Sequence, residues 1–265
     1  MSAAVVVQLT GHTLVVTINR PTARNAVDVA VWEGLGAAFE RAETDPHVRS
    51  VVLTGAGDLA FCAGLDLKSL ASGEFQQRFA PTMREESWGF AGVASHEIST
   101  PIIAAVNGVA MGGGWEIVLS CDLVVAADSA RFGLPEVQRG LIAGGGGAFR
   151  LSRELPRPLA MELLLTGDSI SAARALELGM ANAVVPPEQL MTTALALAER
   201  VNRNAPVAVQ ATKRIARGIV GANVAADESA WLLSADEVRR VMRSADAAEG
   251  PRAFVEKRAP VWQGR

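Results

Sequence analysis

The sequence predicts an α/β fold, and two observations support this prediction. Residues 50–57, 101–108 and 122–129 each contain a short, continuous apolar run of the length expected for a buried strand. The segments between these runs have helix-like sequence. Strands that are apolar on both faces and alternate with helices are typical of a sheet that helices cover. The composition agrees, because 49% hydrophobic and 20% charged residues suit a globular protein with a substantial core.

The N-terminal elements follow the same design. Residues 4–9 and 13–19 are rich in β-branched residues, and Thr10-Gly11-His12 between them is typical of a hairpin turn. Asp28 is an expected N-cap, because apolar residues follow it at helical spacing. These apolar residues are Trp32, Leu35, Phe39 and Ala42. We therefore expect a hairpin followed by an amphipathic helix before the first buried strand.

The second half of the chain is predicted to be mostly helical. Beyond about residue 145 the strand patterns nearly vanish. Ser171 as N-cap and Gly179 just past the C-terminus bracket one helix. We expect one domain over residues 1–200 and a helical region over residues 201–265. A helical segment of that size buries little core alone, so it should pack on its own domain or on another subunit.

Charge and composition exclude several classes of protein. A formal net charge of −3 provides no field to attract nucleic acid or an anionic membrane. Cys62 and Cys121 lack the spacing of a disulfide framework or a zinc site, and the three histidines lack that of metal ligands. Residues 98–115 are uncharged, but Pro101, Asn107 and several glycines argue against a membrane helix. With no secretory signal at the N-terminus, we expect a cytoplasmic protein without a metal.

Residues 108–122, GVAMGGGWEIVLSCD, place three glycines directly before an apolar segment, with one carboxylate, Glu116, near its start. Backbone N–H groups in the first turn of a helix lack intrahelical acceptors and carry partial positive charge. Glycine lets a ligand oxygen approach such groups closely. On these residues alone, a tight turn with a carboxylate favoured by the helix dipole explains the pattern equally well. The triplet matches neither the dinucleotide fingerprint nor the phosphate-binding P-loop.

Two further segments identify the chain by resemblance. The sequence AGLD at residues 63–66 follows the strand expected at 50–54, and Glu136 follows a proline in ARFGLPEVQRGL. With the glycine triplet, these segments resemble the enoyl-CoA hydratase/isomerase (crotonase) superfamily. The resemblance covers nearly the whole chain, since INRPTARNAV, LLLTGDSISAARALELGMANAVV and EGPRAFVEKRAPVW also occur in the expected order.

The resemblance implies a fold and a site. The fold would be a crotonase-like spiral of ββα units, with residues 201–265 as a helical trimerisation region. The backbone N–H groups of Leu65 and Gly113 would hold the enolate-like oxygen of an acyl-CoA thioester, and Glu116 and Glu136 would handle water and protons. Further substrate contacts are implied for Ala63, Asp66, Lys68, Phe254 and Lys257, the last two from a neighbouring subunit. Lys68 is equally well explained as a solvated helix lysine.

The implied activity is hydration of a 2-enoyl-CoA, or the reverse dehydration, in a homo-trimer or a dimer of trimers. No cofactor is implied, because coenzyme A is part of the substrate. A double-bond isomerase or another acyl-CoA lyase, such as a decarboxylase, is the alternative within the family. An isomerase can work with one carboxylate, so the presence of two favours the hydratase.

A protein of another class, non-catalytic or binding nucleic acid on this fold, is the remaining alternative. The basic residues of the tail lack interleaved aromatic residues, so we expect them to form solvated helix faces. The sequence also departs from the hydratase pattern at residues 142–151, IAGGGGAFRL. We expect these glycines to reshape the acyl pocket and Trp115 to add bulk beside Glu116.

Overall fold

The computed structural model describes residues 3–66, 69 and 88–265. Its main sheet has six strands in the order β1-β2-β3-β5-β7-β10. They are β1 Val5–Thr10, β2 Thr13–Ile18, β3 Ser50–Gly55, β5 Ile102–Val106, β7 Leu123–Ala127 and β10 Ala183–Val185. β1 and β2 form an antiparallel hairpin, whereas the other neighbouring strands of this sheet run parallel. The predicted α/β class and the predicted hairpin are confirmed.

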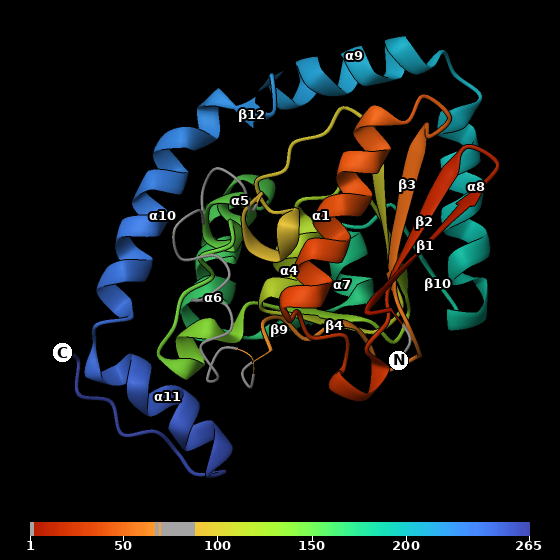
Figure 1. Cartoon of the computed structure of the whole chain (residues 1–265). Coiled ribbons are helices and arrows are strands. Elements are labelled where there is room, and N and C mark those ends of the chain that lie inside the picture. The colour runs from red at the N-terminus through yellow and green to blue at the C-terminus, as the bar shows by residue number, and fades with distance from the viewer. Residues whose placement is uncertain (1–2, 67–68, 70–87) are drawn as a thin grey trace.

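Both faces of this sheet are covered, which explains the continuous apolar runs. Helix α1, Val29–Thr44, covers one face and α8, Leu190–Asn202, covers the other (Figure 1). Along β3, Val51 and Leu53 belong to the core cluster under α1, and Val52 between them belongs to the cluster under α8. This alternation follows from the two-residue period of a strand. Each side chain of β3 is therefore buried against one helix layer or the other.

A second sheet forms from short strands that follow those of the main sheet. It has the order β4-β6-β8-β9, with β4 Ala60–Cys62, β6 Val109–Met111, β8 Arg131–Gly133 and β9 Ser169–Ser171. Its first three strands run parallel, and β9 is antiparallel to β8. Because β4, β6 and β8 follow β3, β5 and β7 along the chain, the same β–β step recurs three times. This second sheet carries the turns that hold the predicted site residues.

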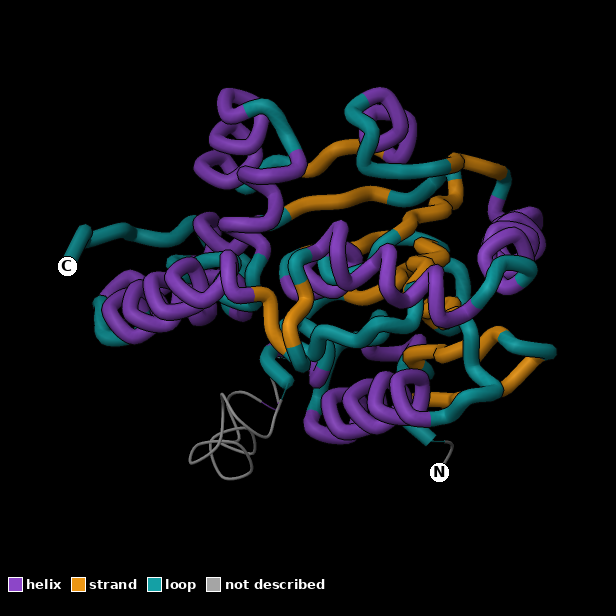
Figure 2. Tube along the Cα trace, turned by 90° about the horizontal axis from the view of Figure 1, so that it is seen from above, coloured by secondary structure: helices purple, strands orange, loops and turns teal. Residues whose placement is uncertain are grey.

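The described residues form seven further α-helices, most of which lie around the strands (Figure 2). They are α4 Gly113–Leu119, α5 Gly147–Glu154, α6 Arg157–Thr166, α7 Ala172–Glu177, α9 Pro206–Arg217, α10 Glu228–Val241 and α11 Ala245–Val255. Short 3-10 helices lie at Pro21–Ala23, Phe90–Gly92, Pro135–Arg139, Pro187–Gln189 and Ala225–Asp227, and β11 Ile219–Val220 pairs with β12 Asn223–Val224. Within the described residues, no helix is long and apolar enough to cross a membrane.

The caps predicted from sequence are present. The Asp28 side chain accepts a hydrogen bond from the N–H of Val31 at 2.9 Å, and the Ser171 side chain accepts one from the N–H of Arg174 at 3.2 Å. Gly179 follows α7 with a φ of +77°, the left-handed conformation expected just past a helix C-terminus. Beyond residue 145 the prediction missed the three-residue strands β9 and β10, which are too short for a period to show.

The C-terminal helices run along the outside of the molecule from α8 to α11 (Figure 1). Helix α10 packs on the glycine-rich segment of its own chain. Ser234 Oγ donates to the carbonyl oxygen of Gly144 at 3.1 Å, and the Trp231 ring meets the Phe149 ring edge-on at 4.9 Å. Part of the tail's apolar surface is therefore covered within one chain. The division at residue 200 stays a prediction.

Candidate active site

The three glycines at the start of α4 are required by the backbone. Gly112 has a φ of +57°, which favours glycine. A Cβ on Gly114 would lie 2.0 Å from the carbonyl oxygen of Cys62, so α4 approaches β4 more closely than a side chain allows. A Cβ on Gly113 would lie 2.3 Å from the ring of Phe90. The helix N-terminus is thus pressed between β4 and an aromatic ring.

The turn at residues 63–66 lies against this helix N-terminus. Val27 donates its N–H to the Gly64 carbonyl at 2.8 Å, and the N–H of Asp66 donates to the Val27 carbonyl at 2.9 Å. This parallel bridge turns the N–H of Leu65 away from Val27. A Cβ on Gly64 would lie 3.1 Å from the nitrogen of Gly113. The structure therefore brings together the two turns predicted to supply the oxyanion donors.

Both predicted donors lack a protein acceptor in the part of the chain that the structure describes. The N–H of Gly113 is in the first turn of α4, where no intrahelical acceptor exists. The N–H of Leu65 faces away from its bridge partner. Two N–H groups in neighbouring turns, one of them at a helix N-terminus, can stabilise an oxygen that gains negative charge.

Glu116 is buried in α4 and held by the glycine-rich segment. Its side chain is 4% exposed, and its Oε1 accepts a hydrogen bond from the N–H of Gly147 at 2.9 Å. A Cβ on Gly145 would lie 2.5 Å from Oε2, and one on Gly147 would lie 2.9 Å from Oε1. The departure at residues 142–151 is therefore a backbone cradle for the carboxyl group, because side chains at 145 and 147 would displace it.

Burial is the largest influence on the pKa of Glu116. Loss of water raises its pKa to about 7, while hydrogen bonds from the N–H groups of Gly147 and Gly145 and the charge of Arg150 act in the opposite direction. The N–H bonds stabilise the ionised form. Glu116 is therefore a carboxyl group that can take up a proton near neutral pH.

Glu136 reaches the same glycine triplet from the 3-10 helix at Pro135–Arg139. A Cβ on Gly112 would lie 3.1 Å from its Oε1. Its Oε2 is buried and accepts no hydrogen bond from the described residues. Burial, and next the negative charge of Glu116, raise the pKa of Glu136 to about 8. A buried carboxyl oxygen without a donor favours the neutral acid and leaves an atom free to bind water or substrate.

Phe90 is a site residue that the sequence analysis missed. Its ring lies on Gly113, its Cβ would be 2.9 Å from a Cβ on Gly145, and it meets the Trp32 ring edge-on at 5.6 Å. Left-handed backbone surrounds it, with positive φ at Trp88, Gly89, Ala91 and Gly92. The signal in the sequence was the WGFAG segment, whose glycines permit this turn.

Trp115 was predicted wrongly. Its side chain is 1% exposed and packs in the core against Phe132, with ring centroids 6.0 Å apart. Successive helix residues point in directions about 100° apart, so Trp115 and Glu116 face different neighbours. The Trp115 side chain therefore packs α4 against the core and adds no bulk beside the Glu116 carboxyl group.

The other predicted contacts lie further out. Asp66 pairs with Arg20 at 2.9 Å and so fixes the turn, with Ala63 exposed at its edge. Phe254 is half-exposed, and the Arg139 guanidinium of the same chain covers its ring at 4.4 Å. Lys257 is exposed, and Lys68 lies outside the described residues. The predicted roles of Phe254 and Lys257 toward a neighbouring subunit stay predictions.

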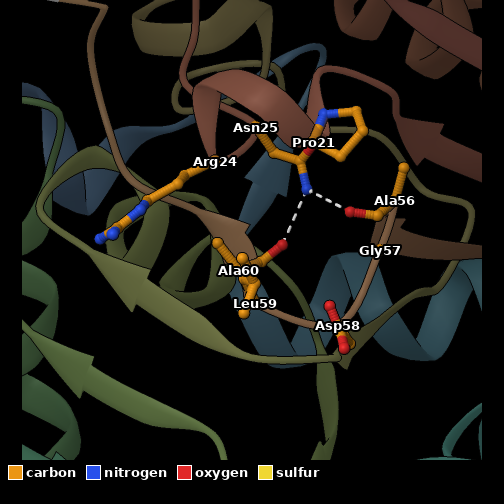
Figure 3. A pocket seen from close by; sticks show the side chains of 8 residues that line it. All are labelled: Pro21, Arg24, Asn25, Ala56, Gly57, Asp58, Leu59 and Ala60. Carbon is orange, nitrogen blue, oxygen red and sulfur yellow. Dashed lines mark hydrogen bonds between the residues drawn. The ribbon is translucent and has the colours of Figure 1, made fainter.

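A hollow borders the turn at residues 63–66. It is lined by residues 21, 24 and 25 on one side and residues 56–60 on the other (Figure 3). The Asn25 side chain joins the two sides by donating to the carbonyl oxygens of Ala56 at 3.0 Å and Ala60 at 2.7 Å. The Ala63 N–H donates to the carbonyl oxygen of Arg24 at 3.1 Å, and the Arg24 side chain extends away from Asn25. Arg24 is thus an exposed residue that lines the hollow and whose backbone contacts the predicted oxyanion turn.

The chain matches a known protein family over almost its whole length. A sequence model of the family described as enoyl-CoA hydratase/isomerase matches residues 10–265. The chain belongs to this family. A carnitinyl-CoA dehydratase of Proteus mirabilis is 40% identical over 269 residues that cover 100% of both chains. The enoyl-CoA hydratase EchA19 of Mycobacterium tuberculosis is 42% identical over 263 residues, which cover 98% of this chain and 96% of that protein.

Solved structures agree with these sequence relatives. The crystal structure of a carnitinyl-CoA hydratase from Mycobacterium avium is 50% identical, covers 100% of both chains and superposes with a TM-score of 0.96. The predicted crotonase superfamily, its α/β fold and its hydro-lyase class are therefore confirmed for this enoyl-CoA hydratase/isomerase family member. The nucleic-acid-binding alternative loses its support.

Proposed function

We propose that this enzyme adds water to the double bond of a 2-enoyl-CoA thioester, or removes water in the reverse direction, with Glu116 and Glu136 as its proton carriers. One observation carries the proposal. Two carboxyl groups with raised pKa values lie near enough for the charge of Glu116 to act on Glu136, and Glu136 lies beside Gly112 in the glycine triplet, where the N–H of Gly113 has no acceptor among the described residues. Hydration needs a base for water, an acid for the α-carbon and donors for the thioester oxygen, and this arrangement can supply all three.

The two carboxyl groups differ in a way that assigns their roles. Glu116 accepts backbone N–H bonds, which favour its ionised form, whereas no described residue donates a hydrogen bond to Oε2 of Glu136. Because each negative charge disfavours the other, the pair holds one proton near neutral pH. We assign the carboxylate of Glu116 as the base and the neutral acid of Glu136 as the proton donor.

The reaction then proceeds with a balanced movement of protons and electrons. Glu116 accepts a proton from water, and the water oxygen bonds to the β-carbon of the enoyl group. The electrons of the double bond move to the thioester oxygen, which the N–H groups of Leu65 and Gly113 hold as an enolate. Glu136 donates its proton to the α-carbon, and the enolate returns to a thioester. The helix dipole of α4 stabilises the charge at the intermediate stage.

Coenzyme A needs cationic and polar contacts along its phosphates. Arg24, an exposed residue that lines the hollow at residues 56–60, carries a guanidinium, and its backbone carbonyl accepts a hydrogen bond from Ala63. Guanidinium groups bind phosphates through paired hydrogen bonds. We therefore extend the substrate-binding surface from the turn at residues 63–66 to this hollow.

The activity test is a panel of 2-enoyl-CoA substrates. We expect crotonyl-CoA, longer 2-enoyl-CoA thioesters or the trimethylammonium-bearing crotonobetainyl-CoA to lose the absorbance of the conjugated thioester as water adds. Crotonobetainyl-CoA is included in the panel because similar proteins are named carnitinyl-CoA dehydratase or carnitinyl-CoA hydratase. The E136Q variant, purified in parallel, controls for contaminating hydratases. A gain of this absorbance with 3-enoyl-CoA, and no loss with any 2-enoyl-CoA, would support an isomerase instead.

We also propose that the protein assembles as a homo-trimer or a dimer of trimers in the cytoplasm. Large apolar side chains of α9, of α10 and of the residue that follows α10 remain exposed in the single chain, and contact between subunits would cover them. They include Val207, Ile215, Leu232, Leu233 and Met242. Light scattering of the full chain should give a mass of three or six subunits. A monodisperse monomer with full activity would contradict this assembly and the shared-site role of Phe254 and Lys257.

A further inference from the structure

We infer that Arg150 is a positioning residue for Glu116. Its buried guanidinium holds α4, which carries Glu116, against α5, whose first N–H binds the Glu116 carboxylate. The inference rests on the proposed function, in which Glu116 is the base. Arg150 is 5% exposed, so its contacts are made entirely inside the protein. A guanidinium keeps its charge at any pH the protein tolerates, and its planar donors hold a fixed geometry.

Arg150 reaches Glu116 by two routes. It lies on α5, and the first residue of that helix, Gly147, donates its N–H to Glu116 Oε1 at 2.9 Å. Its Nη1 also donates to Ser120 Oγ at 2.9 Å, and that hydroxyl donates to the backbone carbonyl oxygen of Glu116 at 2.9 Å. The carboxyl end and the backbone end of Glu116 are thus both tied to the helix of Arg150.

The same guanidinium also holds the segment that carries Phe90. Its Nη2 donates to the carbonyl oxygen of Ala94 at 2.7 Å and to Glu97 Oε1 at 3.3 Å. The N–H of Ala94 in turn donates to the Phe90 carbonyl at 3.0 Å. One cation therefore links α4, α5 and the turn whose aromatic ring lies on Gly113.

The glycine at position 146 makes room for this link. Gly146 has a φ of +100°, and a Cβ there would lie 2.9 Å from Arg150 Nη1 and 3.0 Å from the Trp231 ring. The Trp231 ring of α10 and the Phe149 ring cover the guanidinium, with its Cζ at 5.3 Å and 5.5 Å from their centroids. The glycine-rich segment that binds the Glu116 carboxylate is therefore packed closely against the Arg150 guanidinium.

The charges around the pair give a measurable consequence. Glu116 faces the carboxyl group of Glu136 from the 3-10 helix and the positive charge of Arg150 from α5. Arg150 itself faces Glu97, Arg217 of α9 and Asp227, so two carboxylates and one cation surround it. The charge of Arg150 lowers the pKa of Glu116 against burial, and its removal should raise that pKa.

The test compares R150M, which removes the cation, with R150K, which keeps it but loses the planar donors. R150M should move the acidic limb of the kcat–pH profile to higher pH. R150K should keep that limb in place while kcat falls about tenfold and KM stays within about twofold. The matched control is R153M on the same helix, because Arg153 pairs with Asp227 and none of its contacts among the described residues is with Glu116. R153M should leave the profile unchanged.

A readout independent of activity separates this inference from the proposed function. Carbon NMR of carboxyl-labelled glutamate, with the Glu116 signal assigned by its loss in E116Q, should show Glu116 titrating at higher pH in R150M than in the wild type. If R150M fails to fold, R150K decides: a full kcat in R150K overturns the inference. An unchanged Glu116 titration in folded R150M overturns it as well. A shifted titration in a protein without hydratase activity would instead retain the inference and reject the proposed function.

Discussion

Replacing Glu136 by glutamine is expected to lower the rate of hydration about 10³-fold, because the side chain loses the proton that it would give to the α-carbon. Glutamine keeps the shape of the side chain, so the neighbouring Gly112 backbone and the burial should be retained. E116Q is expected to cause a loss of similar size by removing the base. Both variants should bind a saturated acyl-CoA nearly as tightly as the wild type, since neither group contributes uniform binding. Steady-state kinetics and titration calorimetry measure the two quantities.

The pattern of losses separates the hydratase from the isomerase. Each carboxyl group has its own step in hydration, so each single variant should be severely impaired. If E116Q keeps full activity and E136Q does not, one carboxyl group is sufficient and a one-base isomerase becomes the better interpretation. Equal weakening of acyl-CoA binding and turnover in both variants would mean that these groups support the fold of the site and carry no protons.

Thermal stability provides the control for these variants. Burial raises the pKa of Glu136 in the folded protein above its ordinary value of 4.5, to about 8. The folded state then holds more protons than the unfolded state between these values, so the stability that this group contributes falls as pH rises through that window. E136Q, which cannot ionise, should therefore match the wild type in Tm below pH 4.5 and exceed it above pH 8. If the Tm of E136Q at pH 8 is lower than that of the wild type, the lost activity results from damage to the fold.

The parts of the fold that sequence predicted are those with long or local signals. The strands β3 and β5 are continuous apolar runs because helices cover both faces of their sheet. Asp28 and Ser171 cap helices through their own side chains, so two or three neighbouring residues suffice to predict them. Strands of three residues, such as β4, β6 and β8, have no readable period and depend on pairing with distant segments.

The same distinction between local signals and distant contacts applies to the residues of the candidate site. Glu116, Glu136 and the glycine triplet were predicted because they lie in motifs whose order resembles a known family. Phe90 and Arg150 were missed as site residues because their roles depend on contacts between segments far apart in the chain. The glycine segment at 144–147 was predicted to reshape the acyl pocket, and in the structure its glycines let the backbone close around a carboxyl group. Small residues in a sequence do not tell whether they create space or permit close approach.

The second large effect concerns the N–H of Gly113. Proline at this position should lower kcat about 10²- to 10³-fold, because it removes one donor to the enolate oxygen. Gly113 is the first residue of α4, where helices tolerate proline and no intrahelical hydrogen bond is lost. A Cβ there would nevertheless meet the Phe90 ring at 2.3 Å, so a simple G113P variant would confound the lost donor with a steric clash.

Removing the ring resolves this ambiguity. In an F90A background, Gly113→Ala adds a Cβ with space around it and keeps the N–H, whereas Gly113→Pro adds similar bulk and removes it. We expect F90A/G113A to retain the activity of F90A and F90A/G113P to lose about 10²-fold or more of it. An enolate-like thioester analogue should lose far more affinity for F90A/G113P than a saturated acyl-CoA does, because the donor matters most when the oxygen carries charge. Equal losses for the two ligands would mean that the glycines serve the close packing of α4 and that the oxyanion is held elsewhere.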